Sequence, residues 1–217
     1  MNPKRLDLKT VPSKEPRRNT RIQQRNRELI TEAALEVFSL YGFRGSTLDQ
    51  IAERSGLSKP NLLYYFKNKE EIHRLLIDRL LETWLDPLKE ISADGEPVEE
   101  IRKYINRKLE LARDYPRESR LFANEMLQGA PRIQEELHEL KVLVDEKVVL
   151  IRDWIKAGKL ADLDPYHLFF SIWATTQHYA DFDAQVQAVL EEGSARDKRF
   201  ETAAQFLDKL FTGGLAP

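Results

Sequence analysis

Hydrophobic residues recur at spacings of three and four along almost the whole chain, a pattern that predicts amphipathic helices. The first stripe, in a helix expected over 21–41, consists of Ile30, Ala33, Ala34, Val37 and Phe38. No segment shows the strict alternation that predicts a half-buried strand. We therefore expect an all-α fold.

Glycine and proline set the expected ends of these helices. Gly42 should stop the first helix, and Asn68 should cap a long one that begins at Lys69. Pro87 should kink or end that helix near Asp86, because proline removes a helical hydrogen bond. Further helices are expected over 98–114, 116–127, 131–157, 166–180, 184–191 and 196–211.

The segment 166–180 is apolar on nearly all sides, so it should be buried on more than one face. Phe170, Trp173 and Gln177 share one of these faces. The last helix carries its own stripe, made of Phe200, Ala203, Ala204, Leu207 and Leu210. We expect one face of 166–180 to line a cavity, and another to join the last helix in a four-helix interface of a homodimer. The alternative is that both faces are ordinary monomer core.

Residues 47–65 carry a second kind of pattern, two short helices joined by a tight turn. Thr47 and Gln50 form a capping box, and Gly56 suits the turn because it lacks a Cβ. Ser58 caps the second helix, which should be anchored by Leu62, Leu63 and Phe66. This spacing predicts a helix-turn-helix, whose second helix enters a DNA major groove. An αα-corner in an ordinary helical protein is the alternative.

The side chains left free on this motif are candidate contacts to double-stranded DNA. We expect Lys59, Asn61 and Tyr64 to contact base edges or nearby phosphates. Thr47, Tyr65 and Lys69 should contact phosphates, and Ser58 and Pro60 lie on the same surface. Residues 1–20 form a basic arm that is expected to be disordered. Arg17, Arg18 and Arg21 are candidates for phosphate or minor-groove contacts from this arm.

Charge is divided unevenly along the chain. Residues 1–70 hold 14 Lys and Arg against 8 Asp and Glu, a net charge of +6, whereas the remainder holds 20 against 28, a net charge of −8. Nucleic-acid binding is therefore expected in the N-terminal third. The chain has no cysteine, and no apolar run reaches about 18 residues. We expect a cytoplasmic protein with no membrane segment.

Residues 29–71 contain Leu-Ile-x-x-Ala-Ala-x-x-x-Phe-x-x-Tyr-Gly-Phe-Arg-Gly-Ser-Thr, Ile-Ala-x-x-Ser-Gly-Leu-Ser and Leu-Tyr-Tyr-Phe-Lys-Asn-Lys-Glu-Glu, in this order. This stretch resembles the N-terminal DNA-binding domain of the TetR family of transcriptional regulators. The resemblance implies a basic arm at 1–20, a helix-turn-helix domain at 21–68 and a helical ligand-binding and dimerisation domain at 69–217. It also implies a dimer on a palindromic operator, controlled by a small molecule.

Within that family, residues 61–182 resemble regulators of pyrimidine utilisation that respond to uracil and thymine. The matching stretches include Trp84-Leu-Asp-Pro-Leu-Lys, Glu125-Met-Leu-x-Gly-Ala-Pro and Ile172-Trp-Ala-Thr-Thr-Gln-His-Tyr-Ala-Asp-Phe. A flat pyrimidine suits apolar walls, and an amide such as Gln177 can both donate to and accept from its edge. The predicted ligand contacts are Leu81, Trp84, Leu88, Arg120, Asn124, Phe170, Trp173 and Gln177. Plain packing of these residues is the alternative.

Two other functions are alternatives to a pyrimidine-responsive regulator. An enzyme is disfavoured, because the chain has no Gly-x-Ser-x-Gly, phosphate-loop or dinucleotide motif, and His138-Glu139 lacks the second histidine of a zinc protease. His167 and His178 lie too far apart on one helix to share a metal, so no metal or cofactor is expected. The remaining alternative is a TetR-type repressor of an efflux or other operon that senses a more hydrophobic compound.

Overall fold

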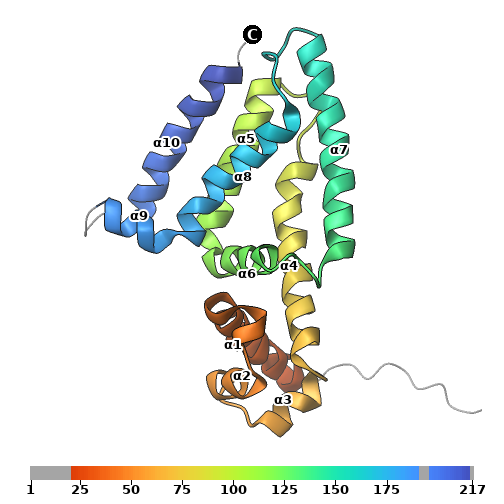
Figure 1. Cartoon of the computed structure of the whole chain (residues 1–217), viewed down its shortest axis with the longest axis vertical. Helices are drawn as coiled ribbons and strands as arrows, with labels where there is room; N and C mark the ends of the chain where they lie inside the picture. The colour runs from red at the N-terminus through yellow and green to blue at the C-terminus, as the bar shows by residue number, and fades with distance from the viewer. Residues whose placement is uncertain (1–20, 191–195, 216–217) are drawn as a thin grey trace, which may run out of the picture.

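A computed structural model describes residues 21–190 and 196–215, and within these ranges the chain forms α-helices and no strand. The expected all-α fold is confirmed. Three helices form a small head at one end, shown at the bottom of Figure 1: α1 (Arg21–Gly45), α2 (Leu48–Ser55) and α3 (Lys59–Tyr65). None of the described helices is long and apolar enough to cross a membrane.

The remaining helices form a larger body. They are α4 (Lys69–Lys89), α5 (Pro97–Asp114), α6 (Pro116–Leu127), α7 (Gln134–Lys156), α8 (Pro165–Asp181), α9 (Asp183–Val189) and α10 (Arg196–Leu215). α4 runs from the head into the body, where α5 packs against α4, α8 and α10 (Figure 1). α6 crosses beneath α8 and also contacts α1. α4 and α6 are therefore the two body helices that reach the head.

The head is built by the local signals that the sequence carries. Thr47 and Gln50 form the predicted capping box, in which each side chain satisfies a backbone N–H of the other residue. Gly56 has the left-handed φ of 71° that favours glycine. Ser58 accepts a hydrogen bond from the backbone of Asn61, and Asn68 caps α4 through the N–H of Glu71.

Several helix ends differ from the sequence-based expectations. α4 continues through Pro87 to Lys89, three residues beyond the expected end at Asp86. Lys147 accounts for part of this, because its buried ammonium donates to the carbonyls of Lys89 and Ile91 that follow the proline. α7 begins at Gln134 and not at Pro131. α10 extends to Leu215, beyond the expected end at residue 211.

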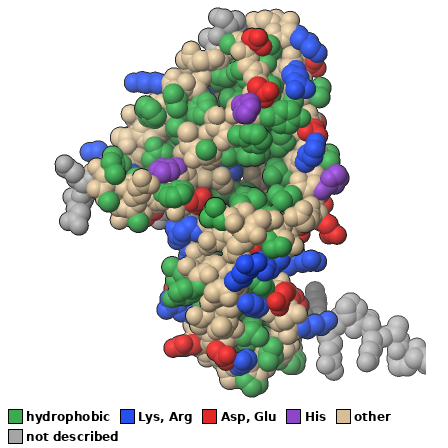
Figure 2. Space-filling view, viewed as in Figure 1, with side chains coloured by type: hydrophobic (Ala, Val, Ile, Leu, Met, Phe, Trp, Pro, Cys, Tyr) green, Lys and Arg blue, Asp and Glu red, His purple; other side chains and the backbone are tan. Residues whose placement is uncertain are grey.

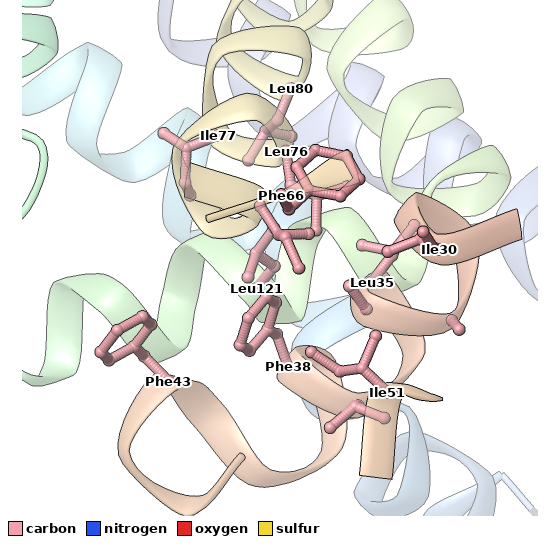
Figure 3. Packing of buried hydrophobic residues seen from close by; sticks show 14 of the residues in the cluster. Ile30, Leu35, Phe38, Phe43, Ile51, Phe66, Leu76, Ile77, Leu80 and Leu121 are labelled. Atoms are coloured by element: carbon pink, nitrogen blue, oxygen red, sulfur yellow. The ribbon is translucent and has the colours of Figure 1, made fainter. Parts of the chain in front are cut away.

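One hydrophobic cluster joins the head to the body. Phe38, Ile51 and Phe66 from α1, α2 and the end of α3 pack in the same cluster as Leu80 of α4 and Leu121 of α6 (Figure 3). Leu62, on the inner side of α3, is fully buried, but Leu63, which we expected to anchor this helix, is exposed. Because the cluster is continuous, a shift of α4 or α6 must also change the packing of the head.

Candidate nucleic-acid interface and ligand cavity

The exposed side of α3 presents the predicted DNA-contacting side chains to solvent. Lys59, Pro60 and Asn61 form its exposed first turn, and Tyr64 is 69% exposed at its other end. Ser58, which caps the helix, and Thr47 are exposed beside this turn. Lys and Arg side chains gather on the head and at its border with the body (Figure 2).

Residues of α1 hold the C-terminal end of α3 in place. Gln23 donates to the hydroxyl of Tyr64 at 3.3 Å, and Asn26 donates to the hydroxyl of Tyr65 at 2.9 Å. Arg27 donates to the backbone carbonyl of Tyr65 and lies 4.4 Å from the centre of the Phe66 ring. These contacts position the two tyrosines relative to α1.

Some predicted phosphate contacts have partners inside the protein. The Lys69 ammonium donates to the carbonyls of Phe43 and Ser46, both at 2.9 Å, and thereby ties α4 to the end of α1. The hydroxyl of Thr47 is engaged with Gln50. Lys59 pairs with Asp49 at 2.9 Å, but both side chains are exposed, and such a pair is easily exchanged for a phosphate.

The described residues include Arg21, which is exposed at the start of α1. Arg17 and Arg18 lie outside the described residues. The contacts of this surface to DNA remain predictions.

The body contains a cavity of about 390 Å³, a size suited to a small molecule. Five of the eight predicted ligand contacts line it, namely Leu81, Trp84, Leu88, Trp173 and Gln177. Its other lining residues are Leu85, Tyr104, Lys108, Phe122, Met126, Leu137 and Leu140. The α4 and α5 side of the lining is deeply buried, whereas Trp173 and Gln177 on α8 are partly exposed.

Three predicted ligand contacts, Phe170, Arg120 and Asn124, do not line this cavity. Phe170 is 50% exposed on the outer face of α8, because the helix turns Trp173 inward and Phe170 toward solvent. Arg120 donates to the carbonyl of Ala180, and Asn124 donates to the carbonyl of Ser39 on α1. Both lie on the side of α6 that packs against its neighbours, whereas Phe122 and Met126 face the cavity.

Lys108 and Tyr104 are polar cavity residues that sequence reasoning missed. Trp173 donates its indole N–H to the hydroxyl of Tyr104 at 2.7 Å. The Lys108 ammonium lies 4.2 Å from the centre of the Trp84 ring, and burial lowers the pKa of Lys108 to about 8. The one available signal was their i, i+4 spacing on the inward side of α5, next to Ile101 and Ile105.

A polar cluster joins α4, α6 and the turn after α6 at the border of the head. The carboxylate of Glu125, fully buried, accepts hydrogen bonds from the backbone N–H and the guanidinium of Arg132, both at 3.1 Å. The Arg132 guanidinium also lies 3.6 Å from the centre of the Phe43 ring. His73 lies 3.7 Å from Glu125, between Phe38 and Phe43. The cluster therefore connects the cavity helix α6 to the end of α1.

Comparison with known proteins decides the family. Residues 30–75 match the family model of bacterial regulatory proteins of the tetR family, and residues 77–217 match that of the C-terminal region of YcdC-like protein. The chain is 46% identical to the HTH-type transcriptional regulator RutR of Escherichia coli (strain K12), over 92% of this chain and 95% of that protein. The chain belongs to the TetR family. It is a DNA-binding transcriptional regulator and not an enzyme.

Solved structures share the TetR-family fold. The ketosteroid transcriptional regulator KstR2 of Mycobacterium tuberculosis has a TM-score of 0.68 at 20% identity, covering 88% of this chain and 95% of that one. A TetR-like transcriptional regulator from Rhodococcus sp. RHA1 has a TM-score of 0.63 at 20% identity, covering 85% and 92%. TetR-family regulators bind DNA as dimers and respond to small-molecule effectors, so the head and the cavity are the two sites to assign.

Proposed function

We propose that this regulator controls genes of pyrimidine utilisation, and that uracil or thymine releases it from its operator. The observation that carries the proposal is the cavity in which Trp84, Trp173 and Gln177 meet. A flat ring fits between apolar and aromatic walls, and the Gln177 amide offers a donor and an acceptor to one pyrimidine edge. The resemblance of residues 61–182 to pyrimidine-responsive regulators supports the same ligand.

We also propose that the active species is a homodimer formed through α8 and α10. Phe170 on α8, and Phe206 and Leu210 on α10, are each at least half exposed. Leu210 was expected in the buried stripe of the last helix, and its exposure fits an interface between two copies. Such a dimer presents two heads to half-sites about 34–36 Å apart, one turn of DNA.

Lys59→Ala is predicted to weaken operator binding and its dependence on salt. If Lys59 releases Asp49 and contacts a phosphate in both heads, the slope of log K against log salt should fall by about 1.8. Fluorescence anisotropy between low and physiological salt measures this slope. Lys141→Ala is the matched control, because Lys141 also pairs with an aspartate but lies on α7 in the body. Equal slopes for wild type and Lys59→Ala would remove Lys59 from the interface.

Gln177→Ala is predicted to weaken the response to uracil while leaving operator binding intact. The variant loses the paired hydrogen bonds to the pyrimidine edge, so its affinity for uracil should fall about tenfold to a hundredfold. Calorimetry against uracil and thymine, together with a gel-shift titration, separates binding from release. Gln185→Ala is the matched control, because this exposed glutamine lies on α9, outside the cavity.

The same experiment distinguishes a pyrimidine effector from a more hydrophobic effector. A TetR-type repressor that senses a larger hydrophobic compound needs no amide at position 177. If millimolar uracil and thymine leave operator affinity unchanged, the pyrimidine effector is rejected, but the DNA-binding role is not affected.

A further inference from the structure

The inner end of the cavity holds a buried ammonium that lacks a hydrogen-bonding partner. Lys108 is 5% exposed, yet within the described residues it makes no hydrogen bond and no ion pair. Its ammonium lies 4.2 Å from the centre of the Trp84 ring. A cation–π contact compensates only part of the hydration that a buried ammonium loses. An acceptor in the cavity would supply the rest.

The charged groups around Lys108 do not fill this role. Asp181 on α8 attracts the ammonium from a distance, but its carboxylate accepts a hydrogen bond from Ser119 and lies near Arg120 and His178. Burial raises the pKa of Asp181, which further weakens it as a counter-ion. Lys108 therefore faces the cavity with its donors unused.

Tyr104 adds a second donor one helical turn away. Its hydroxyl oxygen accepts from Trp173, so its own O–H hydrogen points elsewhere. Among the described residues the hydroxyl makes no further hydrogen bond, and Tyr104 lines the cavity together with Lys108. Two donors on one face of α5, opposite the amide of Gln177, make this end of the cavity rich in donors.

We infer that Lys108, assisted by Tyr104, determines effector specificity by donating to an oxygen of the ligand, and that a ligand without an oxygen at this position is rejected. The inference rests on the proposed function and deepens it, because it names the chemical group that the cavity reads. Gln177 recognises the alternating donors and acceptors of the ring edge, and Lys108 recognises a carbonyl or carboxylate oxygen. A charged donor left facing sulfur or carbon loses its hydrogen bond, and this loss is the basis of rejection.

Calorimetry with uracil, 2-thiouracil, 4-thiouracil and orotate tests this inference. Wild type should bind at least one thio analogue about tenfold to a hundredfold more weakly than uracil, since sulfur is a weak acceptor. Lys108→Met should lose that discrimination, because the donor that favours oxygen is gone, whereas a purely steric penalty of the larger sulfur would persist in the variant. Lys103→Met is the matched control, since this exposed lysine lies on the same helix and pairs with Glu100. Orotate carries a carboxylate in addition to the ring carbonyls of uracil. Orotate binding that is tighter than uracil binding indicates that Lys108 recognises a carboxylate, and weaker orotate binding indicates that it recognises a ring carbonyl.

A second measurement needs only the wild-type protein. An oxygen acceptor stabilises the charged form of Lys108, so its pKa must rise on binding, and a proton is taken up. At pH 8, calorimetry in two buffers of different ionisation enthalpy should show roughly half a proton taken up per site. Affinity should weaken as the pH rises above 8. This readout stands if Lys108→Met fails to fold.

The outcomes separate the two proposals. Uracil binding that Lys108→Met leaves unchanged, thio discrimination that survives in this variant, or binding without proton uptake overturns the role of Lys108 and leaves the pyrimidine effector standing. A wild-type protein that binds none of the four probes overturns both.

Discussion

Glu125→Leu is expected to destabilise the protein by about 3 kcal/mol or more, the largest effect of any single change proposed for this chain. The carboxylate is fully buried and accepts hydrogen bonds from both the backbone N–H and the guanidinium of Arg132. Its removal leaves the guanidinium, three-quarters buried against Phe43, without a counter-ion, and leaves the Arg132 N–H without its acceptor. Breaking one side of a buried pair costs far more than the pair itself contributes.

Urea unfolding at a fixed protein concentration measures this loss, because oligomers change stability with concentration. Glu36→Leu is the matched control, since it removes another glutamate paired with an arginine, Arg54, on the surface of the head. The exposed pair should contribute about 1 kcal/mol or less. Equal losses for the two variants would show that the buried cluster contributes no more than a surface ion pair.

The fold was predictable where local chemistry alone decides the outcome. Thr47, Gly56 and Asn68 each act through their own backbone or the next turn, and all three end or begin a helix where expected. The apolar stripe of α1, from Ile30 to Phe38, is buried for the same reason. The predicted start of α7 at Pro131 was wrong, because Pro131 lies in a turn. Ala130 in this turn has a left-handed φ of 52°, which no residue pattern indicates.

The cavity was only partly predictable, because its lining depends on how helices cross. Trp173 and Phe170 differ by three positions on α8, yet one lines the cavity and the other is exposed. Arg120 and Asn124 were chosen for their chemistry, but their side of α6 packs against α8 and α1. Lys108 was overlooked because a lysine on an amphipathic helix is ordinarily solvent-facing. Only tertiary packing buries it.

The position of α6 suggests how the two sites communicate. Phe122 and Met126 line the cavity, while Asn124 and Glu125 contact α1 and α4 at the border of the head. A ligand that displaces α6 must therefore disturb the Glu125 cluster. The ligand changes operator affinity only by its differential affinity for the two arrangements, and such coupling is typically about 1–3 kcal/mol.

Acid should destabilise the same cluster through His73. Burial lowers the pKa of His73 to about 4, against about 6.5 in an unfolded chain. Between these values the unfolded state binds a proton that the folded state does not, so stability falls as the pH drops below 6.5. The loss should reach about 2 kcal/mol by pH 5, and it is absent above pH 7.

His73→Gln isolates this contribution, because glutamine is polar but does not titrate. Carboxylates also respond to acid in this range, so the informative quantity is the stability difference between wild type and variant at each pH. That difference should shift by about 2 kcal/mol in favour of the variant between pH 7 and pH 5. His138→Gln, on the exposed face of α7, should follow the wild-type profile. Parallel profiles for wild type and His73→Gln would mean that the pKa of His73 is the same in the folded and unfolded chain, and that Glu125 offsets the effect of burial.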